Sequence, residues 1–209
     1  MEDVLSIYAR PYDEEYPVIC MDEKPVQLLE NARESLTSND GRITYEDNEY
    51  IRNGTASIFL FTEPLSGWRY ADAQPQRKRE DWAKQIEWLL NEQYPDAKKI
   101  ILVLDNLNTH NPASLYQTFP PEYARKLVER LEFHYTPKHG SWLDIAEIEL
   151  SALGRQCLGN NRIKDIPTLR EKLKAWYVDR NKKQKGVDWQ FTMEDARIKL
   201  KHLYPQLNF

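Results

Sequence analysis

The sequence predicts a mixed α/β fold in which helices pack over a sheet of strands. Short apolar runs, of which residues 100–104 are the clearest, have the length and aliphatic content of buried strands. Residues 79–94 place four large apolar side chains at helical spacing before Pro95. Strand patterns come first, helices and strands alternate in the middle, and helices come last, which is typical of a layered α/β domain.

The strands are expected mainly in the first half of the chain. Residues 1–9 fit a short helix or lead-in that ends by Pro11. The run "VICMD" at 18–22 fits a strand closed by Asp22, and residues 23–41 read as irregular. Two strands at 43–51 and 56–61 would be joined by Asn53-Gly54, because Asn-Gly is typical of two-residue hairpin turns. The sequence "GWRYADAQ" extends this sheet.

Helices are expected in the second half, with two short strands between them. The strands are residues 100–104 and the run "LEFHYTP". The expected helices are 79–94, 113–130 with a break at Pro120-Pro121, 141–158, 168–182, and a last helix that begins at Thr192. Thr192 and Asp195 fit a capping box, which is a structural feature.

Composition fits an ordinary intracellular globular domain. The 209 residues are 41% hydrophobic and 30% charged, with no run long and apolar enough to span a membrane. The acidic N-terminus lacks the apolar region of a signal peptide. Cys20 and Cys157 give no metal-site spacing and indicate reduced thiols.

The net charge of −4 hides an asymmetry along the chain. Residues 1–153 contain 16 Lys and Arg against 27 Asp and Glu, a net charge of −11. Residues 154–209 contain 13 against 6, a net charge of +7. Charge alone leaves two interpretations of this basic region open: a surface that faces phosphate, or a solvated helical face.

Three carboxylates share a context that suggests a metal site. Asp22 follows "VICM", Asp105 follows "ILVL", and Glu147 lies near the start of the helix at 141–158. Carboxylates gathered in one cleft repel one another unless cations lie between them, and ligand sets made only of oxygen favour hard ions such as Mg²⁺. Two such ions suit the in-line displacement of a phosphoryl group.

The third carboxylate has competitors on the same helix. Ser141 and Asp144 fit a capping box, which gives Asp144 a structural task. Glu147 lies about one turn further along the same face. Glu149 is turned about 200° away from Glu147 by the helical period. Geometry therefore favours Glu147, with Asp144 second.

Five blocks of the sequence together resemble DDE transposases of the bacterial insertion-sequence branch of the mariner-like superfamily. The blocks are "VICMDEKPVQLL", "RNGTASIFLFTEPLSGWR", "ILVLDNLNTHNPASLYQTF", "LEFHYTPKHGSWLDIAEIELSALGRQCL" and "DWQFTMEDARIKLKHLYP". The resemblance implies a ribonuclease H-like fold, a mixed sheet flanked by helices. It also implies an enzyme that cuts DNA at transposon ends and transfers the freed strand to target DNA, typically at TA dinucleotides.

The same resemblance carries over residue by residue. Asp22 and Asp105 correspond to the first and second acids, and Glu147 to the third acid, in the Ser-Trp-Leu-x-x-x-Glu block. These three are expected to be the catalytic residues and to bind two Mg²⁺ or Mn²⁺ ions. The implied partners are DNA and a second copy of the full-length protein, and the implied location is the bacterial cytoplasm at the nucleoid, away from membranes.

The chain departs from the family pattern in two places. Asp144 stands where the family block more often has Asn, so a further carboxylate lies beside the site. Family members also carry helix-turn-helix DNA-binding domains ahead of the catalytic domain, and the 21 residues before Asp22 contain no such unit. We expect a catalytic core at 17–160, preceded by a lead-in at 1–16 and followed by a basic helical extension at 161–209 that packs on the core. The alternative is a remnant that binds DNA or oligomerises without catalysis.

Several neighbours of the acids have two interpretations each. Asn106 and His110 either orient Asp105 and line the cleft or, for His110, cap the next helix. Lys24 either meets a phosphate or is a solvated lysine. The other candidate DNA contacts precede or follow the acidic helix: Lys138, His139, Ser141 and Arg155, with Arg162 and Lys164 beyond them. Trp142 is expected in the core or the cleft wall, with stacking on a flipped base as the alternative.

Overall fold

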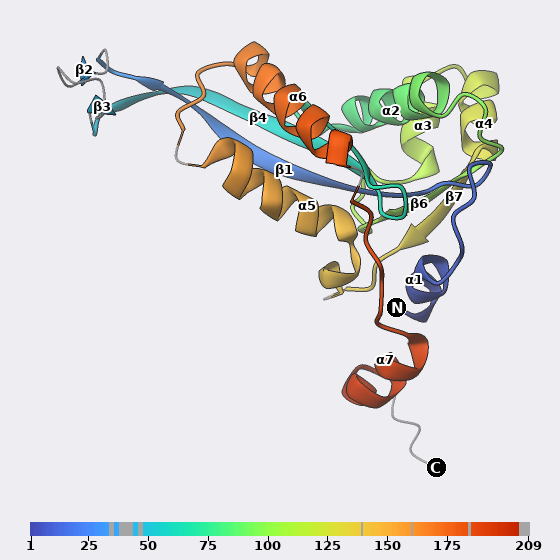
Figure 1. Ribbon diagram of the computed structural model, residues 1–209. Helices are drawn as coiled ribbons and strands as arrows, with labels where there is room; N and C mark the ends of the chain where they lie inside the picture. Colours follow the sequence, from blue (N-terminus) through green and yellow to red (C-terminus); the bar gives the residue numbers. More distant parts are fainter. Residues whose placement is uncertain are drawn as a thin grey trace.

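A computed structural model of the chain shows a five-stranded sheet with helices on both faces (Figure 1). The structure describes residues 1–33, 36–37, 44–45, 48–138, 140–159, 161–183 and 185–204. The strand order is β5-β4-β1-β6-β7. Its strands are β1 (Val18–Asn31), β4 (Tyr50–Glu63), β5 (Trp68–Gln74), β6 (Ile100–Leu104) and β7 (Leu131–Tyr135). A two-stranded sheet pairs β2 (Leu36–Thr37) with β3 (Thr44–Tyr45).

The sheet is mixed, with an antiparallel half and a parallel half. Strands β5, β4 and β1 pair antiparallel, whereas β1, β6 and β7 pair parallel. The parallel strands need crossover connections, and the helices between β5 and β7 provide them. This arrangement confirms the mixed α/β class that the element order predicts.

Two hydrophobic clusters lie on opposite faces of the sheet. One contains side chains of α1 (Glu2–Tyr8), α5 (Ile145–Leu153), α6 (Ile166–Lys183) and α7 (Met193–Lys199). The other contains side chains of α2 (Arg79–Trp88), α3 (Pro112–Thr118) and α4 (Pro121–Glu129). Ile58 and Leu60 belong to the first cluster and Phe59 and Phe61 to the second. A strand covered on both faces reads as a continuous apolar run, which explains "SIFLF".

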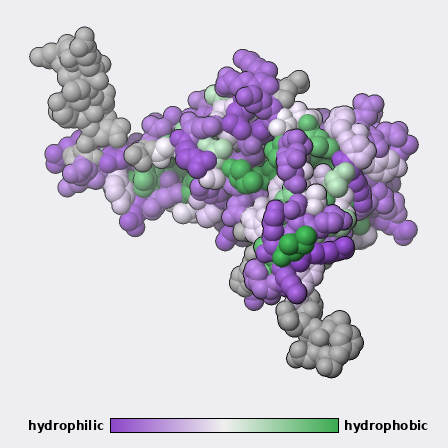
Figure 2. Space-filling model, turned by 60° about the horizontal axis from the view of Figure 1, so that its bottom comes forward, coloured by the Kyte–Doolittle hydropathy of each residue, from purple (hydrophilic) through white to green (hydrophobic). Residues whose placement is uncertain are grey.

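Short irregular helices complete the chain. They are two π-helical turns, η1 (Leu89–Gln93) and η3 (Gly154–Leu158), and two 3₁₀ turns, η2 (Ser141–Leu143) and η4 (Lys201–Leu203). In the described ranges, no helix combines the length and the apolar character that crossing a membrane requires. Figure 2 shows a face on which hydrophilic side chains predominate and apolar ones form small separate patches.

The expectation that the first strand ends at Asp22 is wrong. Strand β1 continues to Asn31, through residues expected to be irregular. Its pairing with β6 stops at Cys20, so beyond that point β1 is an edge strand held only by β4. Pro25 lies in this edge portion, opposite Ser57. An edge strand tolerates proline because one side of its backbone has no partner to donate to.

The hairpin turn expected at Asn53-Gly54 is also wrong. Strand β4 runs through both residues without a break. Gly54 has a φ of 93° and lies where the pairing register with β1 shifts, between Gln27 and Leu29. This is a β-bulge, in which a residue with positive φ lets two residues of one strand oppose one of the other. The strand expected at 43–51 falls partly outside the described residues.

The later elements are largely confirmed. Strand β6 has the expected bounds, and α3 and α4 are separated at the expected Pro120-Pro121 break. The capping box of Thr192 and Asp195 is present at the start of α7. The helix expected from Ser141 is instead three pieces, η2, α5 and η3, and its α-helical part begins only at Ile145.

Candidate active site

The sheet register places Asp22 and Asp105 side by side. Cys20 of β1 pairs with Val103 of β6, and each aspartate lies two residues further along its strand. Because side chains alternate between faces, both carboxylates leave the sheet on the side of Cys20 and Val103. That is the face that α5 covers. Both also lie just beyond the point where the parallel pairing of β1 with β6 stops, toward the carboxyl end of β6, a common location of functional sites.

Asp22 is a partly buried carboxylate beside others. Its Oδ1 accepts a hydrogen bond of 2.7 Å from the backbone N–H of Glu23. Burial, together with the charges of Asp105 and Glu147, raises the pKa of Asp22 to about 6, although the hydrogen bond from Glu23 opposes the rise. The carboxylate is therefore destabilised in its charged form and would gain from a nearby cation.

Asp105 is held by His110. Asp105 follows β6 directly and its side chain is 49% exposed. Its Oδ1 lies 2.6 Å from Nδ1 of His110 and accepts a longer bond of 3.3 Å from the N–H of Leu107. The hydrogen bond from His110 holds the pKa of Asp105 below its usual range, although partial burial opposes this. Asp105 is therefore anionic and fixed in orientation.

His110 is buried between two carboxylates. Its Nε2 lies 3.0 Å from Oε1 of Glu23, and its side chain is 1% exposed. Burial alone would lower the pKa of His110, but the bonds to Asp105 and Glu23 outweigh it and raise the pKa to about 9. Both ring nitrogens then carry protons and donate. The ring of Trp82 lies against that of His110, with centroids 5.9 Å apart.

Sequence reasoning missed Glu23. The strand period places it in the same row as Ile19 and Met21, which are fully buried. A charged residue in a buried row needs a partner, and that partner is His110. The strand alternation could have signalled this role had β1 been predicted to continue past Asp22.

Asp144 and Glu147 approach the aspartates from the start of α5. Asp144 is the N-cap residue: its Oδ1 accepts a bond of 2.9 Å from the N–H of Ala146. The predicted capping box that begins at Ser141 is therefore wrong, because the helix starts three residues later. Asp144 is 3% exposed, and burial beside Asp22 raises its pKa well above the usual range. Glu147 lies in the first turn of α5 and is exposed.

The four carboxylates form one electrostatic cluster. Asp105 and Glu147 raise the proton affinity of both Asp22 and Asp144, so all four lie near one another. Among the described residues, however, no three side chains are close enough as they stand to hold a metal ion. The chemistry of the donors, oxygen atoms with surplus negative charge, fits a hard divalent cation. Oδ2 of Asp144 is buried and has no hydrogen-bond partner among the described residues.

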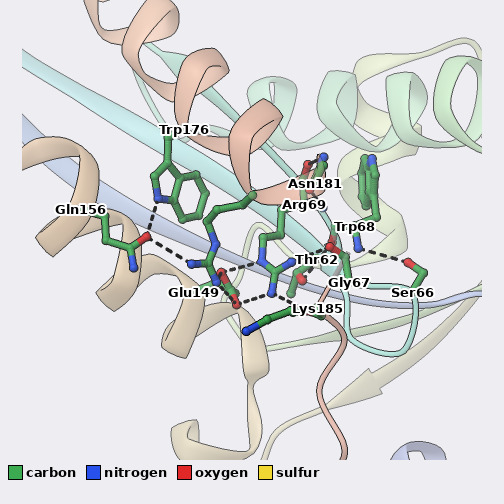
Figure 3. A network of polar contacts seen from close by, with 11 residues as sticks. Thr62, Ser66, Gly67, Trp68, Arg69, Glu149, Gln156, Trp176, Asn181 and Lys185 are labelled. Atoms are coloured by element: carbon green, nitrogen blue, oxygen red, sulfur yellow. Dashed lines mark hydrogen bonds and ion pairs between the residues drawn. The ribbon is translucent and has the colours of Figure 1, made fainter. Parts of the chain in front are cut away.

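Glu149 points to the other side of α5. Its Oε1 accepts hydrogen bonds of 2.9 Å from Arg69 and 3.2 Å from Arg180 (Figure 3). Nε of Arg69 lies 2.8 Å from Oε2 of Glu149, so the two groups form an ion pair, although neither of these two atoms makes a hydrogen bond to a described residue. The helical period that separates Glu147 from Glu149 is confirmed: Glu149 belongs to a buried structural network and not to the carboxylate cluster.

The residues predicted to contact DNA come from β1, from the segment between β7 and α5, and from η3. Lys24 is partly buried on β1, with its Nζ close to Gly154 at the end of α5. Asn106, Lys138 and Arg155 are exposed. His139 lies outside the described residues, and of Ser141 only the main chain, in η2, is described. Trp142 is 38% exposed and packs edge-on against Phe191.

Residues 17–170 match the sequence model of the family described as "DDE superfamily endonuclease". The chain belongs to this family. The matched range runs from the residue before β1 to the first turn of α6, and it contains all four carboxylates of the cluster. No curated protein matches the chain.

Two solved structures share the fold. The structure titled "Crystal structure of the Mos1 mariner paired end complex with Mn" is similar with a TM-score of 0.54 and 16% identity over 84% of this chain and 52% of that one. The "Crystal structure of the Mos1 Strand Transfer Complex" is similar with a TM-score of 0.54 and 14% identity over 90% and 59%. The chain thus spans about half the length of these proteins. The ribonuclease H-like fold implied by the sequence is confirmed, and the bacterial branch remains a prediction.

Proposed function

We propose that the chain is the catalytic domain of a DNA transposase, which cleaves DNA at transposon ends and transfers the strand to target DNA. One observation carries this proposal: Asp22 and Asp105 emerge in register from two parallel strands, and Glu147 approaches them from α5, in a chain of the DDE endonuclease family. Carboxylates that destabilise one another in this way are suited to binding cations and then a phosphodiester.

Asp22, Asp105 and Glu147 are the proposed ligands of two Mg²⁺ or Mn²⁺ ions. Such ions, when bound, activate the attacking water and stabilise the leaving oxygen. His110, which Glu23 holds from the other side, fixes the orientation of Asp105. Asp144 holds the first turn of α5, and so Glu147, in place through its cap to Ala146. The exposed basic residues Lys138 and Arg155, which precede and follow α5 in the chain, are proposed to contact DNA phosphates.

The finer features of this function follow the sequence resemblance. They are target sites at TA dinucleotides, a dimer of the full-length protein, and a bacterial insertion sequence as the source, with the protein at the nucleoid. The similar Mos1 structures are titled as a paired end complex with Mn and a strand transfer complex. These titles support DNA ends and a divalent metal as partners for this chain.

The test is the cleavage of transposon-end DNA by the full-length protein with Mn²⁺. Asp105→Asn should abolish cleavage, because Asn keeps the size of the side chain and removes the charge that holds the ion. Asp96→Asn is the matched control: Asp96 is exposed and lies before β6, at the opposite end of the same strand. Full cleavage by Asp105→Asn would disprove the assignment.

A second candidate is a folded remnant that binds DNA or oligomerises without catalysis. The observation in its favour is that no three described side chains lie close enough to hold an ion as they stand. Calorimetric titration with Mn²⁺ separates the two. The transposase proposal expects heat of binding that Asp105→Asn removes and Asp96→Asn retains. An absence of binding at millimolar Mn²⁺ would favour the remnant.

A further inference from the structure

A groove with a strong excess of positive charge follows α6. One part, about 550 Å³, lies between η3 and the C-terminal half of α6, and its cations are Arg69, Lys172, Arg180, Lys183 and Lys185. A second part, about 530 Å³, lies between the end of β1 and the start of α6, and its cations are Arg33, Arg162, Lys164 and Lys172. Lys172 lines both parts, which therefore adjoin at this residue, and the two together are called here the α6 groove.

The negative charges of the groove do not balance its cations. Asp179 is the acid that lines the first part and Glu30 the acid that lines the second. Asp179 is paired with Lys183 at 2.8 Å. Lys164, Lys172 and Lys185 form no ion pair with any residue that the structure describes. Three uncompensated ammonium groups on one groove favour a polyanion.

The dimensions of the groove suit a duplex backbone. Helix α6 has 18 residues and is therefore about 27 Å long. That length corresponds to about eight base pairs, each of which contributes one phosphate per strand for every 3.4 Å of axis. A small anion would occupy only one end of such a surface.

The groove offers contacts to phosphates but few to bases. Its aromatic residue, Trp176, is 8% exposed and is held by Gln156 and by the guanidinium of Arg180, 5.3 Å from the ring centroid (Figure 3). It is therefore part of the wall and is unavailable for stacking on a base. Lysines at the rim recognise charge without reading sequence.

The groove is separated from the candidate active site by α5. On α5, the buried Glu149 binds Arg69 and Arg180, which line the groove, while Glu147 belongs to the carboxylate cluster. A duplex in the groove is thus not the segment presented to Asp22 and Asp105.

We propose that the α6 groove binds the phosphate backbone of a DNA duplex, without sequence preference, at a place distinct from the cleavage site. This rests on the proposed function only in taking DNA as the substrate. The proposal also decides between the two interpretations of the basic C-terminal region. Basic residues of this region line a groove that faces phosphate, and are not only a solvated helical face.

The experiment compares two triple variants of the full chain with equal loss of charge. The first replaces the uncompensated lysines, Lys164→Gln, Lys172→Gln and Lys185→Gln. The control replaces exposed lysines away from the groove, Lys84→Gln, Lys99→Gln and Lys126→Gln, two of which lie on α2 and α4 across the sheet. Circular dichroism checks that both variants keep the fold. Neither set belongs to the carboxylate cluster.

The measurement is the affinity for a labelled 20-base-pair duplex of arbitrary sequence over a range of NaCl concentrations. Each lost phosphate contact lowers the slope of log K against log salt by about 0.9, so the groove variant should lose about two to three units of slope. The control variant should keep the slope of the unmodified chain. Equal slopes in both variants would overturn the proposal. Tighter binding of duplex RNA than of DNA through the same lysines would also overturn it.

The groove proposal and the proposed function can be refuted separately. If the groove variant loses DNA affinity while Asp105→Asn cleaves normally, the groove stands and the catalytic proposal falls. If Asp105→Asn abolishes cleavage while the groove variant binds DNA like the control, the catalytic proposal stands and the groove falls.

Discussion

Replacing Glu149 by Gln should strongly destabilise the fold, because it breaks a buried ion pair. The side chains of Glu149 and Arg69 are only 6% and 4% exposed, and Arg180 adds a second guanidinium 3.1 Å from the same carboxylate (Figure 3). Gln can accept a bond with its oxygen, but its amide N–H₂ would face guanidinium donors and its neutral charge would leave Arg69 buried without a counter-ion. Breaking a buried pair by removing one partner costs about 3–5 kcal/mol of unfolding free energy.

The assay is equilibrium unfolding in urea, followed by circular dichroism. The midpoint should fall while the slope m stays constant, because the surface exposed on unfolding is unchanged. For a chain of this length the same loss lowers Tm by roughly 6–20 °C, at about 2–4 °C per kcal/mol.

The matched control is Glu147→Gln, the same chemical change two residues away on α5. Glu147 is exposed, so its replacement should change the free energy of unfolding by no more than about 0.5 kcal/mol. Cleavage should show the reverse order, lost with Glu147→Gln and retained by folded Glu149→Gln. A loss below about 1 kcal/mol for Glu149→Gln would refute the reasoning from burial, since an exposed pair is worth that little.

Four further substitutions test other parts of the structure. Gly67→Ala should lower the free energy of unfolding by more than the roughly 1–3 kcal/mol of backbone strain, since its φ is 75° and a Cβ would lie 2.6 Å from a backbone carbon of the C-terminal segment. Gly54 has a φ of 93° and open surroundings, so Gly54→Ala should lose only the free energy of backbone strain. Equal losses of unfolding free energy in urea for the two variants would contradict the close approach at Gly67. Tyr8→Phe removes a 2.6 Å bond to the main-chain carbonyl before Asp144 and should cost about 1–3 kcal/mol in thermal unfolding; an unchanged Tm would count against it. His110→Gln should lower Mn²⁺-dependent cleavage about 10- to 100-fold with the fold retained, and an unchanged rate would reduce His110 to a structural role.

Local chemistry made much of the fold predictable. Strand β6 is covered on both faces, and its five aliphatic residues allow little else. Prolines lie at the start of α3 and α4, where the fixed φ and the missing N–H of proline suit the first turn of a helix, so they mark these boundaries. In each case the signal lies within the element itself, so the sequence suffices.

Elements that depend on a distant partner were not predictable in the same way. The extension of β1 past Asp22 exists because β4 continues beside it, and the paired residues lie far apart in the chain, as Glu23 and Phe59 do. Asn53-Gly54 has the chemistry of a tight turn, but the positive φ of Gly54 serves a bulge instead. A preference for a backbone angle does not say whether the chain reverses there.

The same distinction applies to the candidate site. Asp22 and Asp105 could be named from the ends of their apolar runs, and the parallel register then brings them together. The contact of His110 with Glu23 joins residues 87 positions apart, and it became visible only once β1 was known to continue.

The third carboxylate shows how position on one helix divides three acids among three tasks. Asp144 is nearly fully buried and uses one oxygen to cap α5, so its raised pKa reflects the cost of keeping a charge there. Glu149 is buried too, but it faces two guanidinium groups across the helix. Glu147 alone of the three is exposed toward the cluster, without a described hydrogen bond or ion pair that would commit it elsewhere. An acid that is to bind an exchangeable cation has to be in that state, which is why we propose Glu147, and not its more tightly held neighbours, as the third metal ligand beside Asp22 and Asp105.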